Sequence, residues 1–327
     1  MRALDVGRWT LLALLLATGV DAGAQSPAAP VPSPPPTAAP ATPAPTPTPA
    51  ASPSAATAPS AAPPYATTKV ADNVYVFRYG GYQSMFVVTP AGVIATDPIA
   101  YQRPEAAQAY VAEIRRITSA PIKYLVYSHH HYDHIAGGKP FQDAGASVVA
   151  HRNARTRLEQ LKPADVVLPD MIVDQRSTLE LGGTRVDLVY VGRNHSDSSL
   201  VVLLPKERIL FAVDFVPIQS VMFRDMADGY LPDWLDSIDR VLALDWTTLI
   251  PGHPGPGGRM GTKEDVRAVK EYLTDLSNAT RELASQGKCF DEAMRTLKLP
   301  KYESWSGYAQ YLPGNVERFC EYWARGI

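Results

Sequence analysis

The stretch Ser128-His-His-His-Tyr-Asp-His134 holds four of the seven histidines of this 327-residue chain. The apolar segment Tyr124–Tyr127 precedes it and a Gly-Gly pair follows it. Imidazole and carboxylate groups are the ligands that zinc and similar divalent ions prefer. Because side chains two apart on an extended segment face the same way, His129 and His131 can bind one ion. The turn after them would present Asp133 and the last histidine to a neighbouring ion.

Three more candidate ligands stand directly after short apolar, β-branched runs: His195, Asp214 and His253. A single histidine or aspartate at the end of a strand is more often structural than metal-binding. In combination with the histidine-rich stretch, these residues predict a shared site at the carboxyl ends of several strands.

The pattern His-x-His-x-Asp-His, followed by these three positions in order, resembles the metallo-β-lactamase superfamily over residues 73–253. The resemblance implies that one metal is held by His129, His131 and His195. It implies a second metal held by Asp133, His134 and His253, with Asp214 bridging both. Asp97, in Ile94–Pro98, matches an early aspartate of the superfamily that supports a metal-binding histidine without touching metal. The implied fold is the four-layered αββα sandwich, two mixed β-sheets flanked by helices.

The pattern of apolar residues agrees with this fold. Short runs bounded by turn residues predict strands at 74–79, 85–89, 92–96, 124–127, 147–150, 178–181, 184–191, 200–204, 208–213 and 248–250. Helical periodicity predicts helices at 104–117, 233–244 and 263–285, with Gly287 ending the last one. Aromatic residues beyond Pro300 indicate a C-terminal helical segment that docks on the core or, alternatively, lines a substrate pocket.

The first 64 residues differ from the rest of the chain. Residues 1–24 combine early arginines, an apolar run and an Ala-Gly-Ala site, which is typical of a signal peptide. Residues 25–64 contain fifteen of the thirty prolines and no charged residue, and this composition predicts a disordered linker. We therefore expect an exported, periplasmic or secreted protein without stable membrane insertion after cleavage, whose catalytic domain occupies residues 65–327.

Charge and cysteine content limit the partners and the chemistry. The net charge is −2 and no basic run is present, so nucleic acid is not an expected partner. The sequence does not indicate an oligomeric state. The two cysteines, Cys289 and Cys320, lie away from the histidines and form either a disulfide or two buried thiols.

The implied ligand set predicts a dinuclear metal-dependent hydrolase that acts on a small molecule. Two divalent ions, zinc above all with iron or manganese as alternatives, can share a bridging hydroxide that attacks a carbonyl centre. Asp133 would orient the nucleophile and pass a proton to the leaving group. The expected substrate is an ester, lactone, thioester or related carbonyl compound.

Departures from particular family members narrow this prediction. The bridging Asp214 is similar to glyoxalase II and the lactonases, and it disfavours β-lactam hydrolysis, because the cysteine-containing subclass carries Cys at this position. Only 38 residues separate Asp214 from His253, too few for the extra domain of nucleic-acid-cleaving members. The alternatives are a β-lactam hydrolase, a mononuclear iron persulfide dioxygenase and a metal-binding module without catalysis.

The two remaining histidines and five side chains in nearby loops are not expected to bind metal. His130 should face away from the metals, and His151 should be a hydrogen-bonded structural residue. Five side chains in the flanking loops are candidates for substrate contact: Tyr82, Gln83, Arg193, Asn194 and Arg224.

Overall fold

The computed structural model describes residues 64–327. The expected signal peptide at 1–24 and all but the last residue of the expected linker at 25–64 lie outside the described residues. Among the described residues, no helix is long and apolar enough to cross a membrane.

The first half of the domain forms a seven-stranded mixed sheet whose strand order follows the sequence. Strands β1 to β4 are antiparallel neighbours, whereas β4 to β7 run parallel. The strands are β1 (Tyr65–Lys69), β2 (Val74–Tyr79), β3 (Tyr82–Thr89), β4 (Gly92–Thr96), β5 (Ile122–Val126), β6 (Ser147–His151) and β7 (Met171–Val173).

The second half forms a five-stranded sheet in the order β12-β11-β10-β9-β8. Only β11 and β12 pair in parallel, so this sheet is also mixed. Its strands are β8 (Arg176–Leu181), β9 (Thr184–Tyr190), β10 (Leu200–Leu204), β11 (Ile209–Ala212) and β12 (Thr248–Pro251).

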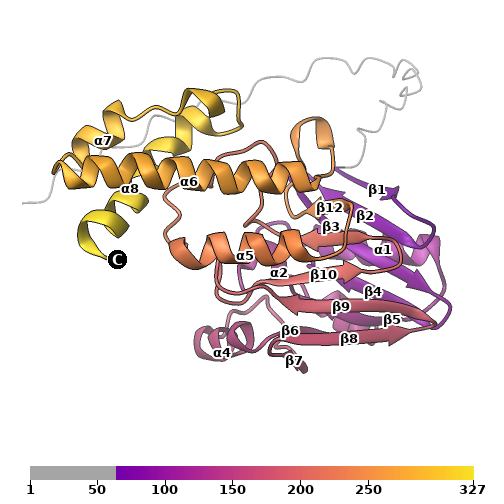
Figure 1. Ribbon diagram of the computed structural model, residues 1–327. Coiled ribbons are helices and arrows are strands. Elements are labelled where there is room, and N and C mark those ends of the chain that lie inside the picture. Colours follow the sequence, from indigo (N-terminus) through magenta and orange to yellow (C-terminus); the bar gives the residue numbers. More distant parts are fainter. Residues whose placement is uncertain (1–63) are drawn as a thin grey trace, which may run out of the picture. The chain divides into compact units, whose positions relative to one another are not determined.

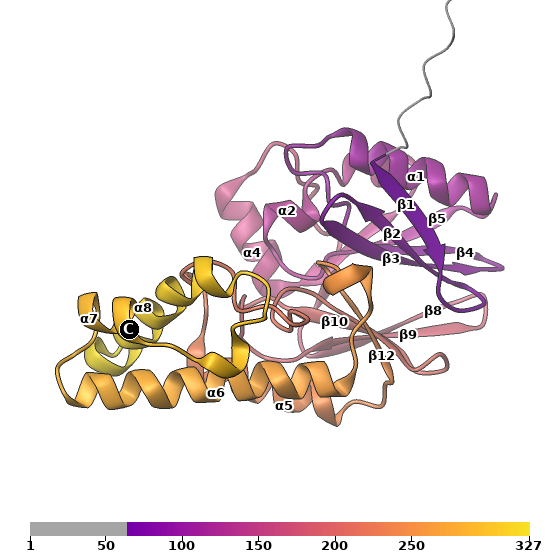
Figure 2. The same cartoon turned by 90° about the horizontal axis from the view of Figure 1, so that it is seen from above.

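Helices cover the outer face of each sheet, as Figure 1 and the turned view in Figure 2 show. The α-helices are α1 (Glu105–Ile117), α2 (Tyr132–Ile135), α3 (Lys139–Asp143), α4 (Arg152–Leu161), α5 (Leu231–Ala243), α6 (Lys263–Ser285), α7 (Asp291–Thr296) and α8 (Tyr308–Arg325). Two short 3₁₀ helices are η1 (Pro256–Gly258) and η2 (Pro300–Tyr302). The first four α-helices accompany the seven-stranded sheet, and the last four accompany the five-stranded sheet. The described residues thus form the expected αββα sandwich.

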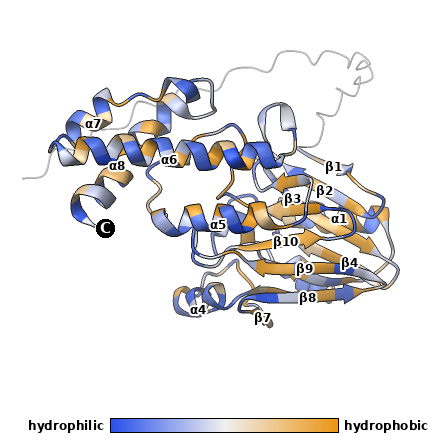
Figure 3. Ribbon diagram, viewed as in Figure 1, coloured by the Kyte–Doolittle hydropathy of each residue, from blue (hydrophilic) through white to orange (hydrophobic). Residues whose placement is uncertain are grey.

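Three apolar layers hold the four structural layers together. Strand β10 is buried on both faces: Leu200 and Val202 point between the sheets, whereas Val201 and Leu203 point toward the helices. Because successive side chains of a strand alternate in direction, a continuously apolar strand can serve two layers at once. Figure 3 shows hydrophobic colouring along β10 and its neighbour β9.

Most of the expected elements are present within one to three residues of the predicted bounds. Helix α5 begins two residues earlier than expected because Pro232 is tolerated in a first helical turn. Gly287 adopts the left-handed conformation, with φ of 67°, directly after the end of α6, as predicted.

Several elements were not predicted. The edge strand β1 is largely exposed and polar, and β7 has three residues, so neither carries a clear alternating pattern. Helix α4 buries only Ala154 and Leu158. A C-terminal helical segment was expected, but the bounds of α8 were not predicted, because it contains Pro313, a residue that normally signals a helix end.

The C-terminal segment docks on the core through α6 and α8, and a disulfide joins its parts. Tyr302, Tyr308 and Phe319 are buried in the same apolar cluster as α6. Of the two alternatives for the cysteines, the structure contains the disulfide, with Cα atoms of Cys289 and Cys320 5.5 Å apart. Closing a loop of this length stabilises the fold by about 3–4 kcal/mol in the chain-entropy description.

Candidate metal centre

The candidate site lies where the carboxyl ends of strands from both sheets meet. Asp97 follows β4 and His129 follows β5, two parallel neighbours of the first sheet. His195, Asp214 and His253 follow β9, β11 and β12, which run in the same direction in the second sheet. Parallel strands end at a common edge, and side chains carried just beyond that edge converge. This topology brings together residues as far apart in the sequence as Asp97 and His253.

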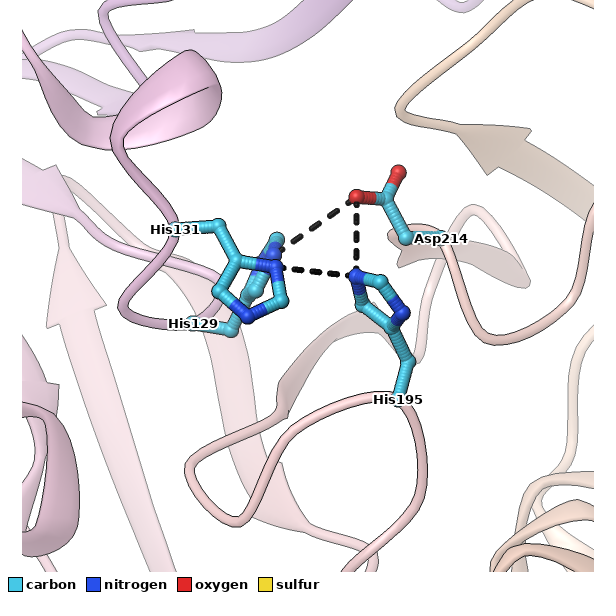
Figure 4. A group of neighbouring side chains, drawn as sticks. All are labelled: His129, His131, His195 and Asp214. Atoms are coloured by element: carbon cyan, nitrogen blue, oxygen red, sulfur yellow. Dashed lines mark hydrogen bonds and ion pairs between the residues drawn. The ribbon is translucent and has the colours of Figure 1, made fainter. Parts of the chain in front are cut away.

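Four of the predicted ligands form a first cluster, consisting of His129, His131, His195 and Asp214 (Figure 4). Each offers a donor atom, and these atoms lie within 4.8 Å of one another. His195 Nε2 is 2.9 Å from His131 Nδ1. Asp214 Oδ2 is 3.6 Å from His129 Nε2 and 3.5 Å from His195 Nε2.

A second cluster comprises Asp133, His134, His253 and the same Asp214. His134 Nε2 lies 3.1 Å from Asp214 Oδ2 and 3.6 Å from Asp133 Oδ2. His253 Nε2 lies 3.3 Å from the other oxygen, Asp214 Oδ1. Asp214 therefore stands between both groups, with its backbone in the left-handed region at φ of 67°. A non-glycine residue adopts this conformation at a cost, and such strain is concentrated at functional sites.

The donor atoms in these clusters fit divalent cations. Among the donor atoms that face the clusters, three are buried and have no hydrogen-bond partner within residues 64–327: His129 Nε2, His134 Nε2 and Asp214 Oδ1. Unpaired buried polar atoms are rare because each loses its hydration without compensation. One cation in each cluster would satisfy all three, and nitrogen plus carboxylate oxygen is the donor set of zinc and of related transition metals.

Hydrogen bonds on the far side of the rings fix which nitrogen faces each cluster. His253 Nδ1 lies 2.9 Å from the Gly81 carbonyl oxygen, which can only accept, so the neutral ring keeps its lone pair on Nε2. His131 Nε2 lies 2.8 Å from Asp228 Oδ2, which leaves Nδ1 for the first cluster. His129 Nδ1 is held by the Ser128 hydroxyl at 2.9 Å.

The electrostatic environment differs between the histidines. Burial lowers the pKa of His129 and of His195, so both rings favour the neutral, metal-binding form. Burial also acts on His134, but the carboxylates of Asp214, Asp133 and Asp97 outweigh it and raise the pKa of His134 to about 9. For Asp214, burial opposes ionisation, yet the neighbouring histidines hold its pKa well below the usual range.

Asp97, expected to support a metal-binding histidine, lies beside His134 and the start of the histidine-rich stretch. Its Oδ1 accepts a hydrogen bond from the Ser128 amide at 2.8 Å, and its Oδ2 lies 3.7 Å from His134 Nδ1. It is fully buried, and burial raises the pKa of Asp97 to about 6 despite the nearby His134. Asp97 thus links the segment before His129 to a histidine of the second cluster.

Two residues at the site were not predicted. Asp228 contacts His131 and also lies 3.8 Å from His195 Nδ1 through Oδ1. Gly252 permits the close approach of the His253 loop, because an added Cβ would lie 2.8 Å from His134 Cε1 and 2.4 Å from Val213 Cγ1. The Pro-Gly-His sequence offered a signal for Gly252. Asp228 lies in an irregular loop before α5, where no pattern marks it.

The remaining histidines behave as predicted. His130 points away from both clusters and interacts with the hydroxyls of Ser198 and Ser196 at 2.9 and 3.0 Å. His151 is hydrogen-bonded to the Asp174 carbonyl oxygen and to the Asn153 amide, at the start of α4.

The five candidate contact residues fall into three groups. Tyr82 is at the site, with its ring 4.6 Å from the ring of His253. Gln83 and Asn194 are buried and shape the loops of His253 and His195, because Gln83 Nε2 donates to the Pro251 carbonyl oxygen and Asn194 Oδ1 accepts from Ser196 and Ser199. Arg193 pairs with Asp233, and Arg224 lies over the exposed Phe223 ring, so neither belongs to the two clusters.

Comparison with known proteins agrees with this geometry. The sequence profile of the metallo-β-lactamase superfamily matches residues 95–253, which include every ligand of the two clusters. The 2,4-dinitroanisole O-demethylase subunit alpha of a Nocardioides strain is 25% identical over 58% of this chain. The metallo-β-lactamase type 2 of Bacillus cereus is 30% identical over 41% of the chain. The chain spans 58% and 53% of the lengths of these two relatives.

Solved structures share the fold. The metallo-β-lactamase from Pontibacter korlensis superposes with a TM-score of 0.56 at 21% identity, over 64% of this chain and 99% of that protein. The superposition therefore covers nearly all of the smaller enzyme. This likeness shows that the fold is shared, while the profile match relates residues 95–253, with all seven clustered side chains, to the metallo-β-lactamase superfamily.

Proposed function

We propose that this protein is a dinuclear metal-dependent hydrolase of a small ester, lactone, thioester or related carbonyl substrate. The observation that carries the proposal is the arrangement of seven donor side chains in two adjacent clusters that share Asp214. Members of this superfamily are mostly metal-dependent hydrolases. When bound, two divalent ions supply an activated water and polarise the carbonyl oxygen of the substrate. We propose zinc, with iron or manganese as alternatives.

The residues of the chain would orient the reaction around this centre. The carboxylate of Asp133 is one-third exposed and lies 3.6 Å from His134 Nε2, so one oxygen remains open toward solvent. At that oxygen Asp133 can take up a proton from the nucleophile and deliver it to the leaving group. The imidazole of His253 is 45% exposed and packs against Tyr82, which places this pair at the open side of the second cluster.

β-Lactam hydrolysis is the second candidate, and the similarity to the Bacillus cereus enzyme favours it. A mononuclear iron persulfide dioxygenase is the third, and the four donors of the second cluster argue against a single-metal enzyme.

The decisive experiment measures metals and turnover on the same preparation. Protein loaded with zinc, iron or manganese is analysed for metal per chain and assayed with esters, lactones, thioesters, β-lactams and a persulfide. We expect about two ions per chain and cleavage of an oxygen or thio ester. One iron per chain with persulfide oxidation would overturn the proposal, and so would two metals without turnover of any carbonyl substrate.

We further propose that the protein is exported, with residues 1–24 as a cleaved signal peptide and residues 25–64 as a linker to the catalytic domain at 65–327. The disulfide between Cys289 and Cys320 supports export, because such bonds persist mainly in oxidising compartments. Intact-mass analysis of protein from the producing cell should give a chain that begins near Gln25. Soluble protein that retains Met1 would contradict export.

A further inference from the structure

Arg103 is fixed beside the second cluster by three contacts. Its guanidinium carbon lies 3.6 Å from the centre of the Tyr82 ring, the same ring that packs against His253. Its Nε donates to the Ile99 carbonyl oxygen at 2.9 Å, and its Nη2 donates to the Asp133 carbonyl oxygen at 3.1 Å. The positive charge of Arg103 is thus held next to the backbone of Asp133 and next to the Tyr82 ring, which packs against His253.

The loop that carries Arg103 is attached to the ligand-bearing segment. The amide of Ile99 donates to the His134 carbonyl oxygen at 2.8 Å, and the amide of Ala100 donates to the Ala136 carbonyl oxygen at 3.1 Å. Ile99 has φ of 51°, which a β-branched residue adopts only when the surrounding contacts impose it. The position of Arg103 relative to Asp133 is therefore fixed by the fold.

The charge of Arg103 is not neutralised by any carboxylate within 4 Å among residues 64–327. The nearby Glu105 accepts instead from the Tyr79 hydroxyl at 2.7 Å. A guanidinium has five N–H donors, and the contacts above use two of them. The other three form the fork that suits a carboxylate or a similar oxyanion.

The surroundings of Arg103 also indicate the rest of the ligand. The rings of Tyr101 and Tyr132 lie 6.2 Å apart, and these residues are near Arg103 and Asp133 in the chain. Tyr101 is 40% exposed. Of the nearby rings, that of Tyr82 lies directly against the Arg103 guanidinium, next to the cluster where the substrate would react.

We propose that Arg103 binds an oxyanion group of the substrate, a carboxylate above all, and so selects anionic over neutral carbonyl compounds. This inference rests on the proposed hydrolase function. Arg103 is a specificity-determining residue, and the ring of Tyr82, which lies against both Arg103 and His253, flanks the apolar part of the substrate.

The test uses two esters that differ only in charge: the monoanion 4-nitrophenyl hydrogen succinate and its neutral methyl diester. We expect the wild-type enzyme to have the higher kcat/KM for the monoanion. Arg103→Gln should reduce that preference about tenfold or more, because a hydrogen bond to a charged group is lost. Arg103→Lys should restore part of it. Arg115→Gln, an exposed substitution on α1, is the matched control and should leave the preference unchanged.

A purely structural role for Arg103 gives a different result. If Arg103 only holds the carbonyl oxygens of Ile99 and Asp133, its replacement lowers both activities equally and the ratio stays constant. That outcome overturns the proposal, as does a wild-type enzyme that does not prefer the monoanion. Metal per chain is measured for each variant, so that loss of metal is recognised.

A binding measurement separates this inference from the proposed function. Calorimetric titration of the zinc-loaded protein compares the monoamide of succinic acid, which carries one carboxylate, with the neutral diamide. We expect tighter binding of the monoamide and loss of the difference in Arg103→Gln. If neither ester is cleaved but this difference is found, the hydrolase proposal fails and the anion site stands. If the difference persists in Arg103→Gln, the anion binds elsewhere and the inference is wrong.

Discussion

The two clusters share Asp214 but hold their histidines in different ways. In the first cluster, burial keeps His129 and His195 in the neutral form, and Asp228 lies against His131 and His195 from outside. In the second cluster, carboxylates surround His134 and favour its protonated form, while His253 is 45% exposed. The first cluster is thus ready to bind a cation, whereas the second must first give up a proton.

This difference suggests an order of loading. A metal ligand has to be deprotonated, so a site with neutral rings binds at lower pH than a site that holds a proton. We expect the first cluster to fill first and the second to control activity, because its exposed His253 and Asp133 face the side where a substrate can approach.

The largest effect should come from removing the residue that both clusters share. Asp214→Ala deletes a carboxylate whose Oδ2 lies near histidines of both clusters and whose Oδ1 lies near His253, so the second metal should be lost and the first retained in part. We expect kcat/KM to fall by more than the roughly 100-fold that loss of an outer partner costs. Metal per chain after dialysis, with steady-state rates, checks this.

The variant His129→Ala tests which of the two clusters loses its metal. His129→Ala should empty the first cluster, since it removes a ligand that belongs to that cluster alone. If Asp214→Ala retains two metals and full activity, the bridging assignment is wrong.

A smaller effect, confined to the first cluster, is expected from Asp228→Asn. The carboxylate of Asp228 lies 2.8 Å from His131 Nε2, and loss of its charge should weaken that orientation. Metal affinity of the first cluster should drop roughly 10–100-fold, with the second cluster much less affected, as measured by chelator competition. Asp225→Asn is the matched control, because Asp225 lies in the same loop and contacts neither histidine. Equal losses in both variants would mean that Asp228 acts only on loop stability.

The sequence predicted which candidate ligands converge better than it predicted the residues that hold them, for a physical reason. The ligands stand at the carboxyl ends of strands, and apolar runs identify strands wherever both faces are buried, as in β10 and β11. Asp228 lies in a loop where Gln219, Arg224 and Met226 all have positive φ. Such a backbone has no periodicity, so its path back to His131 could not be inferred.

The same reasoning explains why the bounds of the C-terminal helix were not predicted and why the disulfide was left open. Helix α8 contains Pro313 and depends on packing against α6, which a local pattern does not reveal. Pairing of Cys289 with Cys320 requires α6, α7 and α8 to come together, and only the three-dimensional arrangement brings the Cα atoms to 5.5 Å.

The contrast in protonation predicts a pH dependence for the second cluster. Without metal, His134 has a pKa of about 9 and is protonated at pH 7, so a cation must displace that proton. Apparent affinity of the second cluster should therefore rise about tenfold per pH unit as pH increases toward 9 and level off above it. His129 and His195 have lowered pKa values and add no such slope to the first cluster.

Calorimetry in two buffers of different ionisation enthalpy measures the protons released by each binding event. We expect close to one proton from His134 for the second cation and fewer for the first. Equal release from both steps would show that the two clusters do not differ in the way proposed.

The smallest effect on metal binding is expected at His130, which lies between two ligands in the sequence but points away from them. Its Nδ1 interacts with the hydroxyls of Ser196 and Ser198, so His130→Ala should lower the free energy of unfolding by about 1–2 kcal/mol. Metal per chain should stay at the wild-type value, because His130 belongs to neither cluster. Urea unfolding and metal analysis of the same preparation separate the two effects. If His130→Ala removes metal as thoroughly as His129→Ala, the alternation of side chains after β5 does not decide which histidines bind, and the ligand assignment must be revised.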